Sequence, residues 1–92
     1  MSRKADPRSE DAIRAILMTY WDPIGVAGIP AASDEYDTQV MAIAGWLHRA
    51  RPSFADLRKY LDDEAYSLSR TWDDDDALDR TTTLLLELDI SI

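Results

Sequence analysis

The chain has 92 residues, no cysteine and a formal net charge of −8 at pH 7. This length allows one domain with a single core, and the lack of cysteine excludes disulfides, thiol catalysis and thiolate zinc sites. The negative charge disfavours nucleic acid, itself a polyanion, as a partner. The first residues lack the apolar region of a signal peptide, and no stretch approaches the roughly 20 apolar residues of a membrane span. We therefore expect a soluble, cytoplasmic protein without membrane contact.

The first helix is expected over residues 9–20. Residues 1–8 lack apolar periodicity and predict a flexible leader, so residues 9–92 form the single helical domain. Ser9 can cap this helix, with acidic residues in its first turn. Its apolar face has the helical spacing i, i+3, i+4 and i+7 and consists of Ile13, Ile16, Leu17 and Tyr20.

The next segment, residues 21–26, has the sequence WDPIGV. Asp22, Pro23 and Gly25 occupy the first, second and fourth positions that a type I turn favours. Apolar side chains in a connection of about a dozen residues are unusual for disordered chain. We therefore expect an ordered loop between the first two helices that packs three side chains over them: Ile24, Val26 and Ile29.

A second helix is expected over residues 34–50, with Ser33 as its N-cap. Asp34, Glu35 and Asp37 would then place carboxylates at the positive end of the helix dipole. The apolar stripe comprises Tyr36, Val40, Ile43 and Leu47, widened by Met41, Ala44 and Trp46. Gly45 costs up to about 1 kcal/mol relative to Ala inside a helix, and close packing against another helix is the expected compensation.

The WDPIGV segment and the DEYD segment at residues 34–37 together resemble a family of small bacterial helical proteins. The resemblance covers residues 13–47 and extends more weakly to residue 68. It implies a short helix that leads into the loop and a second helix that opens at the DEYD segment. The family has no established activity, but some similar small acidic proteins are immunity partners of bacterial toxins.

A third helix is expected over residues 54–69, after Pro52 ends the second and Ser53 caps the new one. The short connector predicts that the second and third helices form a hairpin. The apolar face consists of Phe54, Leu57, Leu61, Ala65 and Leu68. On the polar side, we expect two ion pairs at i,i+4 spacing, Arg58 with Asp62 and Lys59 with Asp63.

The fourth helix is expected from the four aspartates at 73–76 to about residue 88, with Asp73 as N-cap. Its apolar face consists of Ala77, Leu78, Leu84, Leu85 and Leu88. An alternative stays open, because apolar and polar residues alternate over 86–92 as they do in a strand. Such a strand would need to pair with a second chain. In either case, the leucine-rich end predicts a homodimer through the C-terminal segment.

Four helices with short connections predict an all-α, antiparallel, bundle-like domain. The acidic charge favours a non-catalytic interaction protein that binds a basic protein, in its most specific form an immunity or inhibitor protein for a toxin-like partner. One alternative is a small metal-binding or enzymatic module that uses the acidic loop, since hard cations bind carboxylate oxygens. The other is a structural protein that oligomerises.

The candidate binding residues are all acidic. They are Asp22, Asp34, Glu35, Asp37, Asp62, Asp63, Glu64, Asp73, Asp74, Asp75 and Asp76. The sequence contains no P-loop, dinucleotide-binding or HExxH motif, so we expect no cofactor. We also predict no catalytic residue, and we interpret the single histidine, His48, as a helix-end residue whose charge suits the negative end of the dipole.

Overall fold

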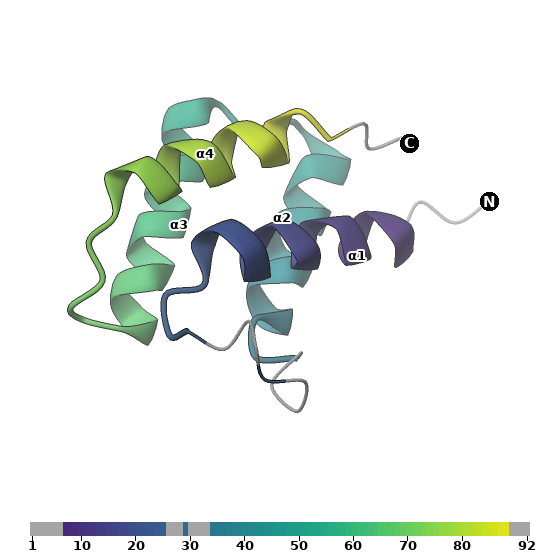
Figure 1. The fold of residues 1–92 in the computed structure, drawn as a ribbon. Helices are drawn as coiled ribbons and strands as arrows, with labels where there is room; N and C mark the ends of the chain where they lie inside the picture. Colours follow the sequence, from purple (N-terminus) through teal and green to yellow (C-terminus); the bar gives the residue numbers. More distant parts are fainter. Residues whose placement is uncertain (1–6, 26–28, 30–33, 89–92) are drawn as a thin grey trace.

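The computed structural model describes residues 7–25, 29 and 34–88 (Figure 1). These residues form helices and connecting turns without a β-strand among them, which confirms the all-α class. The elements are α1 (Pro7–Ile16), the π-helical turn η1 (Leu17–Trp21), α2 (Asp37–Arg49), α3 (Phe54–Leu68) and α4 (Asp75–Leu86). Within the described ranges, no helix is both long enough and apolar enough to cross a membrane.

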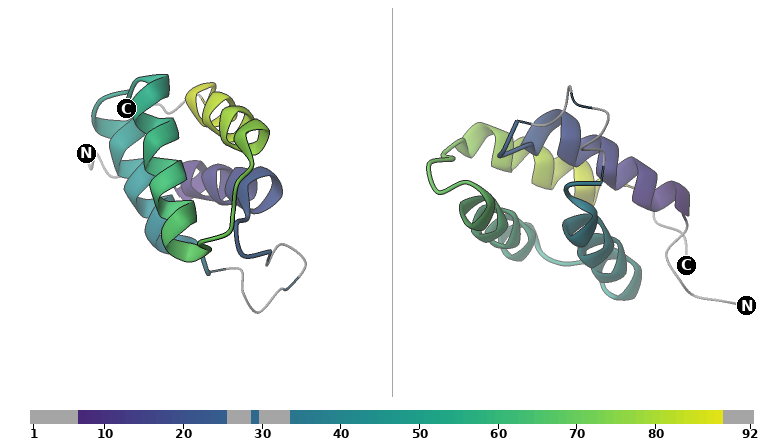
Figure 2. Two further views of the ribbon diagram at one scale, coloured as in Figure 1. Left: turned by 90° about the vertical axis from the view of Figure 1, so that its left-hand side faces the viewer. Right: turned by 90° about the horizontal axis from the view of Figure 1, so that it is seen from below.

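The helices form two layers that cross each other (Figures 1 and 2). One layer holds α1 and α4, which run in opposite directions, and the other holds the antiparallel α2 and α3. Two side-chain contacts join α2 to α3. Gln39 Nε2 donates to Glu64 Oε1 at 2.8 Å, and the rings of Trp46 and Tyr60 meet edge to face. The predicted hairpin is confirmed, within a bundle-like fold whose layers are crossed.

The core between the layers receives apolar side chains from every helix. Burial of each Val, Leu or Ile side chain stabilises the fold by about 1.5–3 kcal/mol, more than an exposed ion pair contributes. Two threonines of α4 are also fully buried, and Thr82 Oγ1 donates to Leu78 O at 2.7 Å within its own helix. The buried aliphatic residues are Ile13, Leu17, Val40, Ile43, Ala44, Leu47, Leu57, Leu61, Ala65, Leu78 and Leu85.

The first helix begins earlier than expected and changes its geometry near its end. α1 starts at Pro7, a residue type favoured in the first turn because it needs no N–H partner there. The predicted leader is therefore wrong for residues 7 and 8, and its residues 1–6 lie outside the described chain.

The turn η1 corrects the predicted apolar face of this helix. Its i→i+5 bond runs from the Asp22 N–H to Leu17 O at 2.8 Å, so this turn holds one residue more than an α turn. Trp21 consequently follows Leu17 into the core and is only 2% exposed, whereas Tyr20 is 40% exposed. The prediction was right for Ile13 and Leu17 and wrong for Tyr20.

α2 also departs from its predicted start. Asp34 to Tyr36 form a turn in which the Asp37 N–H donates to Asp34 O at 3.1 Å, and the helix follows at Asp37. The predicted cap Ser33 lies outside the described residues, as does Val26. Gly45 has no close neighbour on another helix in the described chain, because the one atom within 4 Å of a Cβ placed there belongs to Arg49. The packing reason expected for Gly45 is therefore wrong.

The predicted bounds of α3 are confirmed within one residue, and Ser53 Oγ accepts from the Asp56 N–H at 3.1 Å as a cap should. α4 is capped by Asp74, not Asp73, since Asp74 Oδ1 accepts from the Ala77 N–H at 3.0 Å. Arg51 donates to the carbonyl oxygens of Leu86 and Leu88 at the other end of α4. This helix ends at Leu86, and residues 89–92 of the strand alternative lie outside the described chain.

Three residues that were expected to pack are exposed. Phe54 lies at the first position of α3, Met41 lies on the outer side of α2, and Ile29 belongs to the loop. In the loop, Ile24 alone of the described apolar residues packs partly against the core. Local apolar character was therefore not sufficient to place these side chains inside.

Candidate functional site

Tyr36 joins the loop after η1 to the start of α2. Its side chain is 1% exposed. The hydroxyl donates to Asp22 Oδ1 at 2.7 Å and accepts from the Ile24 N–H at 3.3 Å. The ring meets that of Trp21 edge to face, with centroids 5.2 Å apart. Burial and the Asp22 carboxylate both raise the pKa of Tyr36 above its usual value, so the phenol stays protonated and can donate.

The segment from Asp22 to Gly25 forms the predicted turn. The Gly25 N–H donates to Asp22 O at 3.1 Å, and Pro23 is buried beneath the turn. Asp22 itself has a left-handed conformation with φ of 34°, which Asp tolerates better than most residues because its side chain can hydrogen-bond locally. Gly25 has φ of +67° and meets no steric cost there. The resemblance motif therefore serves turn geometry and packing.

A second contact fixes α1 to the start of α2. Arg14 bonds Asp37 Oδ1 through Nη2 at 2.6 Å and through Nε at 3.2 Å, and its other nitrogen reaches Asp11 at 3.3 Å. The bond to Asp37 raises the pKa of Arg14 above its already high usual value. Asp37 is thus occupied by a structural ion pair.

These contacts involve two of the four acidic residues that were predicted as a loop site. Asp22 is bound by Tyr36 and Asp37 by Arg14, whereas Asp34 and Glu35 are exposed. Across the described ranges, no three carboxylate, thiol or imidazole side chains come together in a group that could hold a metal ion. The structure does not assemble the four predicted loop residues into one site.

A different set of carboxylates gathers where α4 crosses α3. Arg58 of α3 contacts Asp79 at 2.6 Å and Asp75 at 3.3 Å, both on α4. The predicted pair of Arg58 with Asp62 is wrong, because α4 brings two other carboxylates to the same guanidinium. The predicted pair of Lys59 with Asp63 is confirmed at 2.9 Å.

We call this region the α3–α4 acidic surface. Its seven aspartates outnumber the two basic residues that pair with them, Arg58 and Lys59, and every one of the seven is exposed. Some of these side chains cap a helix or form ion pairs. The others make no hydrogen bond or ion pair within the described chain. The surface consists of Asp62, Asp63, Asp73, Asp74, Asp75, Asp76 and Asp79.

Glu64 differs from its predicted role as part of this surface. It is half-buried and accepts the hydrogen bond from Gln39 on the α2 side of α3. The burial of Tyr60 and, to a smaller extent, the charge of the neighbouring Glu64 raise the pKa of Tyr60 to about 12. Tyr66, one turn beyond Asp62 and Asp63, is instead 56% exposed, and Arg70 lies over its ring.

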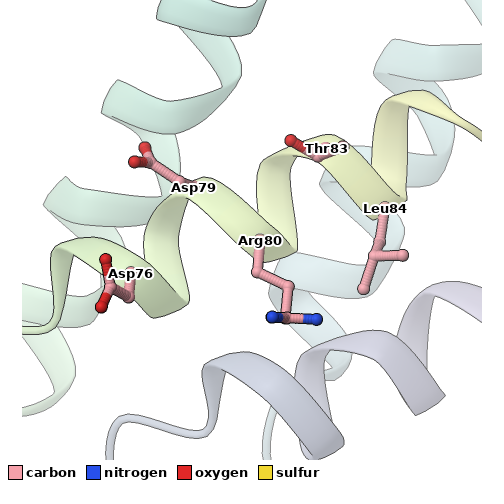
Figure 3. Close-up of a pocket in the computed structure, with 5 residues that line it drawn as sticks. All are labelled: Asp76, Asp79, Arg80, Thr83 and Leu84. Carbon is pink, nitrogen blue, oxygen red and sulfur yellow. The ribbon is translucent and has the colours of Figure 1, made fainter.

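A pocket of about 460 Å³, open to solvent, borders the α3–α4 acidic surface on α4 and shares Asp76 and Asp79 with it. In Figure 3, Arg80 and Leu84 extend toward α1 and η1, whereas Asp79 extends toward α3. The Arg80 guanidinium lies 5.9 Å from the centre of the Tyr20 ring. The wall of the pocket combines both signs of charge with apolar carbon. It consists of Asp76, Asp79, Arg80, Thr83 and Leu84.

His48 lies in the last turn of α2, as predicted. Both of its ring nitrogens are buried, and neither has a hydrogen-bond partner within the described chain. Among residues 7–25, 29 and 34–88, no carboxylate hydrogen-bonds to this ring.

No family model, curated protein or solved structure matches this chain. The resemblance carried by the two loop motifs stays a prediction.

Proposed function

We propose that this protein is a non-catalytic interaction protein that binds a basic protein through its α3–α4 acidic surface. One observation carries the proposal: Asp62, Asp73 and Asp76 are exposed and make no hydrogen bond or ion pair in the described chain, although they stand beside other carboxylates. Of the three, only Asp76 has a role within the fold, in the first turn of α4 at the positive end of the helix dipole.

Stability does not account for the density of charge on this surface. Exposed ion pairs contribute about 0–1 kcal/mol each, and crowded like charges repel one another. Association does account for it, because a strongly negative patch attracts a positive partner and accelerates encounter, from about 10⁵–10⁶ to as much as 10⁸–10⁹ M⁻¹s⁻¹ at low salt.

Tyr66 supports the same proposal. Tyrosine is enriched at protein interfaces and often dominates their binding energy. An exposed ring beside Asp62 and Asp63 combines an apolar contact with charge attraction. The immunity or inhibitor form of the function rests further on the acidic sequence and on the family resemblance, and the cysteine-free sequence supports a cytoplasmic location.

The test compares two variants that lose the same charge. The first replaces the unpaired carboxylates, as Asp62→Asn, Asp73→Asn and Asp76→Asn. The second is a control on other exposed positions, Glu35→Gln, Asp56→Asn and Glu87→Gln. A binder cross-linked to the wild-type chain in its native cells is purified, and its association with each form is followed by stopped-flow tryptophan fluorescence across salt concentrations.

The first variant should associate about tenfold more slowly at low salt, with a weaker salt dependence. Its melting temperature should be unchanged or higher, because repulsion is relieved. The association rate of the control variant should fall much less. Equal rates and equal salt dependence for both variants and the wild type would show that this surface does not capture the binder.

A further inference from the structure

The outer side of α2 differs from the other exposed helix faces of the molecule. Residues 38–47 include no ionisable side chain, although charged residues make up 30% of the sequence. The exposed faces of α3 and α4 by contrast carry many carboxylates. We use the name α2 outer face for the residues that share this side at helical spacing: Thr38, Met41, Ala42, Gly45 and Arg49.

Met41 stands at the middle of this face and is 64% exposed, the highest value among the large hydrophobic residues that the structure describes. A single exposed apolar residue is common on monomers and carries no argument alone. Here it is flanked by Ala42 and Gly45, and a second helix can approach the backbone closely once the Arg49 side chain beside Gly45 turns away.

The ends of the α2 outer face have opposite charge. Asp34 and Glu35 lie exposed just before the helix, and Arg49 lies exposed in its last turn. The side chains of these three residues make no ion pair or hydrogen bond within the described chain. A neutral centre with an acidic end and a basic end is complementary to itself when two copies meet antiparallel, because each end then faces the opposite charge.

We propose that two copies of this chain associate through the α2 outer face, antiparallel and about a two-fold axis between Met41 and Ala42. In that register, residue n of one copy faces residue 83 − n of the other. Met41 then packs on Ala42 of the second copy, and Thr38 lies opposite Gly45. The same register places Arg49 opposite Asp34 of the second copy, twice by symmetry.

This arrangement gives a use to two features of α2, the glycine at position 45 and the lack of charge over residues 38–47. Gly45 has no packing neighbour from another helix within the described residues, yet glycine there costs about 1 kcal/mol relative to Ala. In the dimer, the Arg49 guanidinium, which lies 3.2 Å from a Cβ placed at Gly45, turns to Asp34 of the second copy and leaves room for the facing helix. The acidic copies repel one another overall, and the uncharged centre with its two cross-pairs is where they can touch.

The interface differs from the C-terminal one that the sequence suggested. Leu85 is buried, and Leu86 and Leu88 pack against the core. Arg51 also binds the carbonyl oxygens of Leu86 and Leu88. The described end of α4 is therefore already covered by its own chain.

One helix face per copy buries less than the roughly 1,200 Å² of a stable complex, so the dimer is weak. Sedimentation equilibrium of the full chain, from about 1 µM to about 1 mM, spans the range of such affinities. The expected mass rises from the 10.4 kDa of one chain toward twice that value. Met41→Glu should abolish the rise, whereas Tyr66→Glu, at another exposed position on α3, should preserve it.

Charge exchange tests the register. Arg49→Glu and Asp34→Arg should each weaken self-association by about tenfold or more, because both cross-pairs become repulsive. An equimolar mixture of the two variants should form a heterodimer with near wild-type affinity, since every cross-pair is again of opposite sign. A merely structural role for either residue would not give this rescue.

A cysteine-free chain allows a further check of proximity. Ala42→Cys should form a disulfide-linked dimer on mild oxidation, whereas Ser67→Cys, exposed on α3, should not do so at the same rate. Circular dichroism of every variant should match the wild type, because all the changed positions are exposed. A mass of 10.4 kDa at all concentrations, or a dimer that Met41→Glu leaves intact, would overturn the proposal.

Discussion

The hydroxyl of Tyr36 donates a 2.7 Å hydrogen bond to the carboxylate of Asp22, fourteen residues earlier in the chain. This bond connects the end of η1 to the start of α2 across the loop. The same hydroxyl accepts the Ile24 N–H, so one buried oxygen satisfies both a carboxylate and a backbone group. The loop is thereby held by a specific polar contact in addition to apolar packing.

Tyr36→Phe should destabilise the fold by about 1.5–3 kcal/mol, the range for a hydrogen bond to a charged group. The ring and its packing against Trp21 remain, so the loss isolates the hydroxyl. Urea denaturation followed by tryptophan fluorescence measures it. Tyr66→Phe removes an exposed hydroxyl that has no partner in the described chain and should change stability by less than about 0.5 kcal/mol.

Alkaline pH should destabilise the protein through the same group. The pKa of Tyr36 is raised in the folded state by burial and by Asp22, and the unfolded value is about 10. The folded state therefore holds its proton more tightly, and stability present below about pH 10 is lost as pH rises toward the folded pKa. Tyr60, with its pKa raised to about 12, acts in the same direction.

Tyr36→Phe should make the free energy of unfolding fall less steeply between about pH 10 and 12. Urea titrations at several pH values in that range, with wild type and variant side by side, provide the comparison. An unchanged pH dependence in the variant would mean that Tyr36 does not carry the alkaline sensitivity.

The loop offers a matched pair of isoleucines. Ile24 packs partly against the core, whereas Ile29 is 50% exposed. Ile24→Ala should cost about 1–3 kcal/mol, less than the 2–5 kcal/mol of a fully buried site, and Ile29→Ala should cost under about 0.5 kcal/mol. Equal costs from chemical denaturation would contradict the described packing of the loop.

The start of α4 offers a second matched pair. Asp74 accepts the Ala77 N–H, whereas Asp73 makes no hydrogen bond or ion pair in the described chain. Asp74→Ala should therefore lower stability by about 1 kcal/mol, as loss of an N-cap does. Asp73→Ala should leave it unchanged or slightly higher, because one repulsive charge is removed. Thermal melts of the two variants distinguish these positions, and the reverse order of stability would reassign the cap.

Much of the fold could be predicted from the sequence. Helical spacing of Leu57, Leu61 and Ala65 located the buried side of α3, and Ser53 marked its start. These signals are local, because periodicity and caps depend on residues within a few positions of one another. The antiparallel hairpin followed from the short connector between α2 and α3.

Contacts between elements that are far apart in the sequence were harder to predict. Arg58 has an acidic residue at i+4, so the pattern predicted Asp62 as its partner, yet the crossing of α4 supplies Asp75 and Asp79 instead. Tyr36 was predicted as an apolar stripe residue, and its role toward Asp22 was missed. This contact could have been predicted from the chemistry of the residues. A buried tyrosine hydroxyl needs a hydrogen-bond partner, and Asp22 lies in the loop that precedes Tyr36.

The extra residue in η1 also determines how this chain should be aligned with any other. An α helix advances about 100° per residue, so a single added position rotates everything that follows onto a different side. A related chain that lacks this residue would match here only with a one-residue gap, placed between Leu17 and Trp21. An ungapped alignment would pair its buried aromatic residue with Tyr20 and assign the core position to the wrong side chain.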